Sequence, residues 1–300
     1  MNIPCYPEFL DINPGLKDDI KGRLSLAPDG VSEFTFAGLF LFNDRYKYRV
    51  SRLEDKTLII SGVQPPHDPG EESRTFFMTP CACPGRGILD DLFRTHDFWK
   101  NIPDSVFIPN EDHFGEWGIQ VSEDRANFDY LFLREELADL KGKKFHKKRN
   151  LIAQFNSLYA CVDKPLSQEL TGDAMEVLEL WKEEKGMAGD YHSAREALLF
   201  FDALDLCGRI YYIGDSPVAW CLGEPVAHNR IFTVHFEKAL EKYKGIYQYL
   251  NQSFALSLPE TISHINREQD LGDEGLRQAK MSYRPSGFVR KHTGVRFIQD

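Results

Sequence analysis

The stretch KGKKFHKKRNLIAQF, residues 141–155, decides how the second half of this chain is expected to fold. Its apolar residues Phe145, Ile152 and Phe155, followed by Tyr159, recur at intervals of seven, three and four residues. This spacing predicts a helix from about Lys143 to Tyr159 with one apolar face. The cations of the stretch then lie in the first two turns, at the helix end that is already partly positive. An anion bound across that end would offset the repulsion and would use the free backbone N–H groups.

The same stretch concentrates positive charge in an acidic chain. Six of the nine residues from Lys141 to Arg149 are Lys or Arg, whereas the whole chain has a formal net charge of -10. A local run of this kind predicts an anion-binding site rather than a generally basic surface. The residues expected to bind phosphate groups are Lys143, Lys144, Lys147, Lys148 and Arg149. The alternative is a solvated face that Glu135, Glu136 and Asp139, one turn upstream, partly neutralise.

Length and composition suit a soluble protein of two domains. The chain has 300 residues, 42% hydrophobic and 27% charged, and we expect one domain at residues 1–140 and another at 141–300. No apolar run reaches the roughly 18 residues that a membrane span needs, and the first residues do not resemble a secretory signal. We therefore expect a cytoplasmic protein. The six cysteines lack the spacing of a metal site, so no metal is expected.

The expected helices and strands follow a similar order in the two halves. The second half predicts a helix that contains residues 174–181 and ends near Gly186, and further helices at 193–206, 243–258 and 274–283. The strands expected there are 209–213, 218–223, 230–237, 261–265 and 288–291. The first half predicts a hairpin at 46–53 and 57–63, a strand at 74–79, a helix at 88–99 and strands at 105–108 and 127–133. The segment IPNED at 108–112 echoes INREQD at 265–270, which favours a duplicated fold.

This order of elements is similar to the GNAT acyltransferase fold. KGKKFHKKRNLIAQF at 141–155 and INREQDLGDEGLRQAKMSYRP at 265–285 resemble signature segments of a bacterial family of uncharacterised proteins. That family resembles the catalytic domain of phosphatidylglycerol lysyltransferase. The resemblance implies an α+β fold of two tandem GNAT-like domains, with mixed sheets flanked by helices. It also implies a co-substrate rather than a permanently bound cofactor. The acyl donor is aminoacyl-tRNA in the related lysyltransferases and acyl-CoA in ordinary GNAT enzymes.

One segment departs from the pattern of enzymes that use acyl-CoA. Those enzymes hold the pyrophosphate on a Q/R-x-x-G-x-G/A loop before a helix, where free N–H groups face the phosphates. The matching stretch here runs from Lys242 to Tyr247. Lys242 and Gly245 fit the pattern as donor-binding residues, but Tyr247 occupies the place of the second small residue. This bulk favours an anion other than CoA at the helix end.

The expected strand at 230–237 supplies acid/base candidates. Transfer of an acyl group to an amine needs a base for the attacking group and a proton for the leaving group. Phenylalanine and valine at the even positions alternate with Thr233, His235 and Glu237, so the last two share a face. We expect His235 and Glu237 to be catalytic. The alternative is a hydrogen-bonded core histidine and a glutamate at an exposed strand end.

A further group of candidates follows the expected strand at 261–265. Glu268 and Asp270 are expected to hold an amine substrate, with Asn266 and Arg267 as further substrate-binding residues. Alternatively, these residues cap and brace the helix that starts near Asp273. Tyr283 is a candidate donor of the leaving-group proton, or else an amphipathic core tyrosine.

These patterns together predict a transferase that moves an aminoacyl group from aminoacyl-tRNA to an amine or hydroxyl acceptor. The basic helix would bind the tRNA, and the acceptor would be a small molecule, a peptide or a lipid. Two alternatives stay open: an N-acyltransferase that uses acyl-CoA, and a non-catalytic protein that binds RNA or nucleotides on the same fold.

Overall fold

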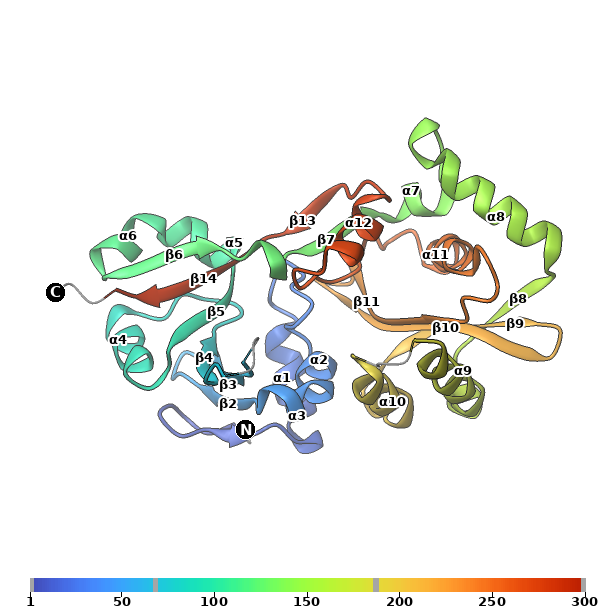
Figure 1. Cartoon of the computed structure of the whole chain (residues 1–300). Helices are drawn as coiled ribbons and strands as arrows, with labels where there is room; N and C mark the ends of the chain where they lie inside the picture. Colours follow the sequence, from blue (N-terminus) through green and yellow to red (C-terminus); the bar gives the residue numbers. More distant parts are fainter. Residues whose placement is uncertain (1–2, 67–69, 186–188, 298–300) are drawn as a thin grey trace. The chain divides into compact units, whose positions relative to one another are not determined.

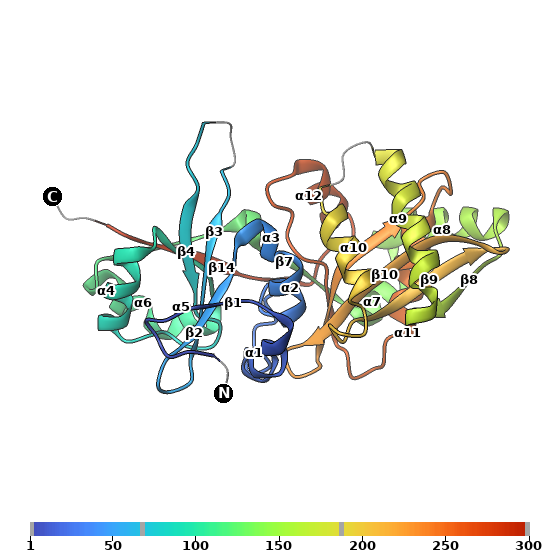
Figure 2. The same cartoon turned by 90° about the horizontal axis from the view of Figure 1, so that it is seen from below.

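The computed structural model describes residues 3–66, 70–185 and 189–297, whose strands form two seven-stranded sheets (Figure 1, Figure 2). The chain divides into two units. The first comprises Met1–Asp129, Gln269–Glu274 and Phe288–Asp300, and the second comprises Tyr130–Glu268 and Gly275–Gly287.

The first unit is built on a sheet with the strand order β1-β2-β3-β4-β5-β14-β6. Leu89 and Leu92 of one helix and Phe114 of another pack with Phe77 and Trp99 of the sheet to form a buried core. The strands are β1 (Leu10–Asp11), β2 (Arg49–Arg52), β3 (Leu58–Gln64), β4 (Arg74–Met78), β5 (Phe98–Pro103), β6 (Ile119–Glu123) and β14 (Lys291–Arg296). The helices are α1 (Lys17–Leu24), α2 (Phe36–Leu41), α3 (Asn43–Tyr46), α4 (Arg86–Thr95), α5 (Asp104–Phe107) and α6 (Glu111–Glu116).

The second unit is built on the sheet β13-β7-β12-β11-β10-β9-β8. In Figure 1, two helices, α9 and α10, cover one face of this sheet, and α11 covers the other. The strands are β7 (Asp129–Leu133), β8 (Cys161–Pro165), β9 (Cys207–Ile213), β10 (Ser216–Val226), β11 (Ile231–Ala239), β12 (His264–Asn266) and β13 (Gly287–Val289). The helices are α7 (Arg134–Asp139), α8 (His146–Leu158), α9 (Thr171–Lys185), α10 (Tyr191–Leu199), α11 (Ile246–Ser257) and α12 (Glu274–Met281). Both α7 and α8 contact α11.

The basic stretch folds close to its prediction. A 3-10 turn at Lys143–Phe145 leads into α8, and Phe145, Ile152 and Phe155 are buried as the helical spacing requires. The hairpins expected around residues 54–56 and 214–215 are also present as β2–β3 and β9–β10.

Several other predicted elements are wrong. The expected helix at 88–99 ends at Thr95, and the strand expected at 105–108 is replaced by β5 at Phe98–Pro103 followed by α5. All residues of β5 are buried, so Phe98 and Trp99 are apolar like the buried face of α4. The sequence therefore gives no clear sign of where the helix ends and the strand begins. The helix expected at 193–206 spans Tyr191–Leu199. The strands β1, β6, β8 and β14 were not predicted, because β1, β8 and β14 lack regular apolar alternation and β6 has only two apolar residues, Ile119 and Val121.

The two units differ from the ranges 1–140 and 141–300. The strand β14 pairs with β5 and β6, and this pairing places the end of the chain in the first unit. Residues 269–274 also belong to the first unit, so the chain crosses between units more than once. Composition carries no sign of such crossings, because each crossing segment is short.

Both sheets contain a parallel pair of strands followed by a residue with a left-handed backbone. In the first unit β4 pairs with β5 up to Phe77 and Trp99, and Asn101 has a φ of 52°. In the second unit β11 pairs with β12 up to Thr233 and Asn266, and Glu268 has a φ of 55°. The segment that corresponds to 266–268 is therefore 99–101. The predicted match at 108–112 is wrong, since residues 108–110 form a 3-10 helix.

Gly223 gives a testable prediction about the second sheet. A Cβ at this position would lie 1.8 Å from the carbonyl oxygen of Thr233, on the neighbouring strand. Both groups are in strand backbone, so the contact cannot be relieved by a rotamer change. Gly223→Ala should lower the free energy of unfolding by about 2 kcal/mol or more in chemical denaturation. Gly172→Ala in α9 is the matched control, because no atom lies within 4 Å of its added Cβ. Equal stability of both variants would contradict this account of the sheet.

Candidate functional site

The candidate site lies where two parallel strands of the second unit separate. β11 and β12 pair from Ile231 and His264 to Thr233 and Asn266. Beyond this point β11 continues to Ala239 beside β10, whereas the chain after Asn266 leaves the sheet. Functional side chains of α/β sheets commonly collect beyond the carboxyl ends of parallel strands. The predicted residues His235, Glu237, Arg267 and Glu268 all follow the separation.

Side chains connect β11 with the segment after β12 beyond the point where the two backbones separate. The imidazole of His235 donates from Nδ1 to Oε1 of Glu268 at 2.8 Å and from Nε2 to Oε1 of Glu224 at 3.1 Å. His235 stands at a β-bulge, since Leu222 faces Phe236 and Gly223 faces Val234 in the register. A bulge inserts one extra residue and re-aims its side chain.

His235 is held as a cation. Burial alone would lower the pKa of its imidazole, but the hydrogen bonds and the charges of Glu224 and Glu268 overcome burial and raise the pKa to about 10. Both ring nitrogens then carry protons at neutral pH, which matches two carboxylate partners. An imidazolium cannot accept a proton, so this geometry argues against the expected role of His235 as a base. We assign it the role of positioning Glu268.

Glu268 is the better placed acid/base candidate. Its backbone N–H donates to Oδ1 of Asn266 at 2.7 Å, and its carbonyl accepts from the N–H of Tyr130 and from Nζ of Lys280, each at 3.2 Å. These bonds fix its left-handed backbone. The side chain is 21% exposed, and Oε2 has no partner within the described part of the chain. One carboxylate oxygen is thus fixed and the other is available to an ammonium group or a proton.

Glu237 has a different environment. Nη2 of Arg267 donates to its two oxygens at 3.1 and 3.2 Å, and Nδ2 of Asn251 donates to Oε1 at 3.1 Å. The Glu237 side chain is only 13% exposed and is neutralised by the guanidinium. These contacts anchor Arg267, and the predicted catalytic role of Glu237 stays a prediction.

Asp270 and Asn266 are both completely buried but in different units. Oδ1 of Asp270 accepts from the N–H of Gly272 at 2.9 Å, and Oδ2 lies 3.4 Å from Arg125. These contacts match the alternative in which Asp270 braces the segment before α12. Asn266 supports the backbone of Glu268, as described above, and the substrate contact predicted for it stays a prediction.

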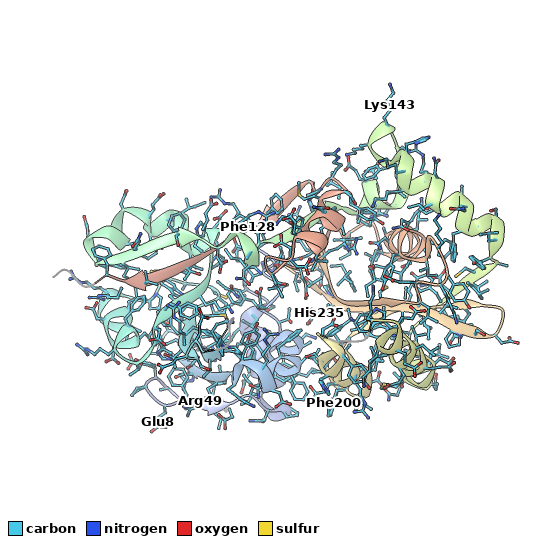
Figure 3. All side chains as sticks on the ribbon, in the orientation of Figure 1. Glu8, Arg49, Phe128, Lys143, Phe200 and His235 are labelled. Atoms are coloured by element: carbon cyan, nitrogen blue, oxygen red, sulfur yellow. The ribbon has the colours of Figure 1, made fainter. Side chains whose placement is uncertain are left out.

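The basic stretch divides into cations with different partners. Lys141 pairs with Asp139 at 2.5 Å, and Lys144 pairs with Glu136 at 2.6 Å. These two pairs agree with the alternative prediction, in which upstream carboxylates partly neutralise the basic stretch. Arg149 donates to the carbonyls of Leu140 and Gly142 and so closes the turn after α7. Lys143 and Lys147 are exposed, and Figure 3 shows Lys143 pointing outward at one end of the segment.

Lys148 is the lysine of the basic stretch that lies beside Tyr283, a predicted site residue. Its Nζ donates to Oγ of Ser282 at 2.7 Å and lies 3.8 Å from the ring centre of Tyr283. Arg267 lies 5.5 Å from the same ring centre. The Tyr283 hydroxyl is buried and has no hydrogen-bond partner within the described ranges. Burial raises the pKa of Tyr283 to about 12, against small opposing effects of Arg267 and the nearby Gln248 side chain, so the phenol keeps its proton.

The segment compared with a pyrophosphate loop has a packing explanation. Gly245 precedes α11 with a φ of 95°, and a Cβ there would lie 2.7 Å from the carbonyl oxygen of Leu151 in α8. The close approach of α8 therefore requires glycine whether or not a phosphate binds. Lys242 is exposed beside the ring of Tyr243. Donor binding by Lys242 and Gly245 stays a prediction.

Two residues of the site were missed from sequence. Glu224 lies in β10, and Asn251 lies in α11, where it contacts both Glu237 and the carbonyl of Tyr247. Glu224 had a signal in the sequence, because it is a single carboxylate in the otherwise apolar run VAWCLGEPV. Asn251 had none, since polar residues are ordinary on a helix.

Most of the chain matches one protein family. Residues 25–293 match the family described as phosphatidylglycerol lysyltransferase, C-terminal. The chain belongs to this family. The chain is also similar to an uncharacterised protein of Mycoplasmoides gallisepticum, with 26% identity over 185 residues. The match covers 57% of this chain and 56% of that protein, so the chain spans little more than half of the relative's length.

Solved structures share the fold of this lysyltransferase family member. A conserved protein of unknown function from Bacteroides thetaiotaomicron has a TM-score of 0.85 and 29% identity, covering 96% of this chain and 99% of that one. L-PGS from Bacillus licheniformis has a TM-score of 0.61 and 12% identity, covering 97% and 94%. The predicted α+β fold is confirmed: two GNAT-like domains in tandem, with mixed sheets flanked by helices. The description of the family names a lysyltransferase, which is a kind of acyltransferase.

Among the described residues, no helix combines the length and the apolar character needed to cross a membrane.

Proposed function

We propose that the second unit transfers an aminoacyl group from aminoacyl-tRNA to an amine or hydroxyl acceptor. The observation that carries this proposal is the Glu268 carboxylate, which is fixed by His235 through one oxygen and is unbonded at the other. His235 between Glu224 and Glu268 leaves a net charge of one negative unit, which favours an amine near the free oxygen.

The free oxygen Oε2 of Glu268 carries the proton during the reaction. The acceptor nitrogen or oxygen attacks the carbonyl carbon of the aminoacyl ester, and its proton passes to Oε2 of Glu268. The new amide or ester bond forms as the bond between the acyl carbon and the ribose oxygen breaks. The proton held by Glu268 then passes to the departing ribose oxygen, which leaves as the free hydroxyl of the tRNA.

Four observations favour aminoacyl-tRNA over acyl-CoA as the donor. The family description names a lysyltransferase, and the exposed Lys143 and Lys147 suit a chain of phosphates. The segment before α11 is packed against α8 at Gly245, and Tyr247 fills the second small position of a pyrophosphate loop.

The proposal is tested by a direct transfer assay. The full chain is incubated with a tRNA pool charged with labelled amino acids and, in separate reactions, with small amines, peptides or vesicles that contain phosphatidylglycerol. The expected result is label on one acceptor class, at a rate that falls steeply with added salt. Parallel reactions contain labelled acetyl-CoA. Transfer from acetyl-CoA alone, or from neither donor, would contradict the proposal.

A further inference from the structure

Three elements of the second unit bring hydrogen-bond donors around one tyrosine ring. Lys148 comes from α8, Arg267 follows β12 and Tyr283 follows α12. The ring centre of Tyr283 lies 3.8 Å from Nζ of Lys148 and 5.5 Å from Cζ of Arg267. The cluster thus contains two cations and a phenol hydroxyl, all of which donate hydrogen bonds.

The cluster holds more positive charge than its protein partners neutralise. Arg267 pairs with Glu237, whereas Lys148 donates a hydrogen bond to the neutral hydroxyl of Ser282. The Tyr283 residue is 5% exposed, and its hydroxyl has no partner at hydrogen-bond distance within the described ranges, although the Gln248 side chain lies near enough to lower its pKa. Buried polar groups are normally paired, so an orphan hydroxyl beside an uncompensated cation indicates a missing acceptor with negative charge.

We infer that Lys148, Arg267 and Tyr283 form the subsite for the 3′-terminal phosphodiester of the donor tRNA, an inference that rests on the proposed function. Arg267 is adjacent in sequence to Glu268, so an anion held here lies near the proposed reacting group. Lys148 also shares a segment with the exposed Lys143 and Lys147, and this continuity favours a nucleic-acid chain over an isolated phosphate.

The charge state of Lys148 gives the subsite a measurable signature. Its pKa is lowered to about 8, because burial disfavours the ammonium and Arg267 repels it. A bound anion would stabilise the ammonium and raise this pKa. Binding at pH 8.5 should therefore take up protons, which calorimetry in buffers of different ionisation enthalpy detects.

The test uses calorimetric titration of the full chain with cytidylyl-(3′→5′)-adenosine, a dinucleoside monophosphate that carries one phosphodiester. We expect Lys148→Met to weaken binding about tenfold or more, the typical effect of losing a charged hydrogen bond. Tyr283→Phe should weaken it a few-fold without lowering stability, because the hydroxyl has no protein partner to lose. Lys148→Arg should retain most of the affinity. Lys164→Met is the matched control and should bind like the wild type, because Lys164 is an exposed lysine of the same unit that also lies over a tyrosine ring, Tyr212, outside the cluster.

Three results would overturn the inference. The first is equal binding by the Lys148→Met and Lys164→Met variants. The second is Lys148-dependent binding of glycerophosphoglycerol without binding of the dinucleotide, which would assign the cluster to a lipid headgroup. The third is a mixture of cytidine and adenosine binding as tightly as the dinucleotide. Equilibrium binding needs no transfer, so Glu268→Gln should still bind the dinucleotide, and failure of the proposed reaction would leave this result unchanged.

Discussion

Replacing Glu268 with Gln is expected to lower the rate of aminoacyl transfer by about 100- to 10,000-fold, the usual contribution of a positioned base. The amide of Gln keeps the size of the side chain and can still accept the hydrogen bond from Nδ1 of His235. It cannot take the proton of the attacking group. The loss should therefore fall on kcat, with a smaller change in KM for the donor.

The control for this variant is Glu260→Gln. Glu260 is an exposed glutamate of the same unit, outside the site. Its replacement should leave both kinetic constants near those of the wild type. A Glu268→Gln variant that retained a third or more of the wild-type kcat would show that another group takes the proton.

Replacing His235 with Leu is expected to lower the free energy of unfolding at pH 7 by about 3–5 kcal/mol. The change leaves the carboxylates of Glu224 and Glu268, which are 8% and 21% exposed, without their shared partner. Removing one of these charges should restore part of the loss, so the double variant His235→Leu with Glu224→Leu should be more stable than His235→Leu alone. Chemical denaturation of the three proteins measures both effects. A His235→Leu variant as stable as the wild type would contradict the assigned network.

The same network predicts how stability varies with pH. The pKa of His235 is raised in the folded protein to about 10, against 6.5 for the free side chain. Its contribution is therefore fully present below pH 6.5 and is lost as the pH rises through about 10. Between pH 7 and pH 9.5 the wild type should lose on the order of 2–3 kcal/mol more stability than His235→Leu. Parallel stability curves for the two proteins would be inconsistent with a raised pKa.

The sequence predicted many of the individual residues of this site but not how they combine. Strand alternation identified His235 and Glu237, and the segment after β12 identified Arg267 and Glu268. The structure joins these groups across about thirty residues of chain, His235 with Glu268 and Glu237 with Arg267. Alternation along one strand cannot reveal that the neighbouring strand ends at Asn266. The register of a β-bulge is also absent from such a pattern.

The basic stretch shows a second limit of sequence patterns. Its helical spacing predicted α8 closely, because burial of an apolar face dominates there. The lysines beside that face cannot be told apart from the sequence, but they have different neighbours in the fold. Lys147 is exposed, whereas Lys148, one residue later, reaches Ser282 and Tyr283. Those partners come from a segment more than a hundred residues away, so only the tertiary fold separates the two lysines.

The central claim is that His235 is a fixed cation that holds Glu268 as the working carboxylate. It is tested most directly by the ¹⁵N NMR signals of the His235 ring between pH 6 and pH 10.5, with His235→Gln used to assign them. We predict two protonated ring nitrogens through pH 8, with deprotonation near pH 10. A ring that is already neutral at pH 7 would contradict the account and would return His235 to the role of base.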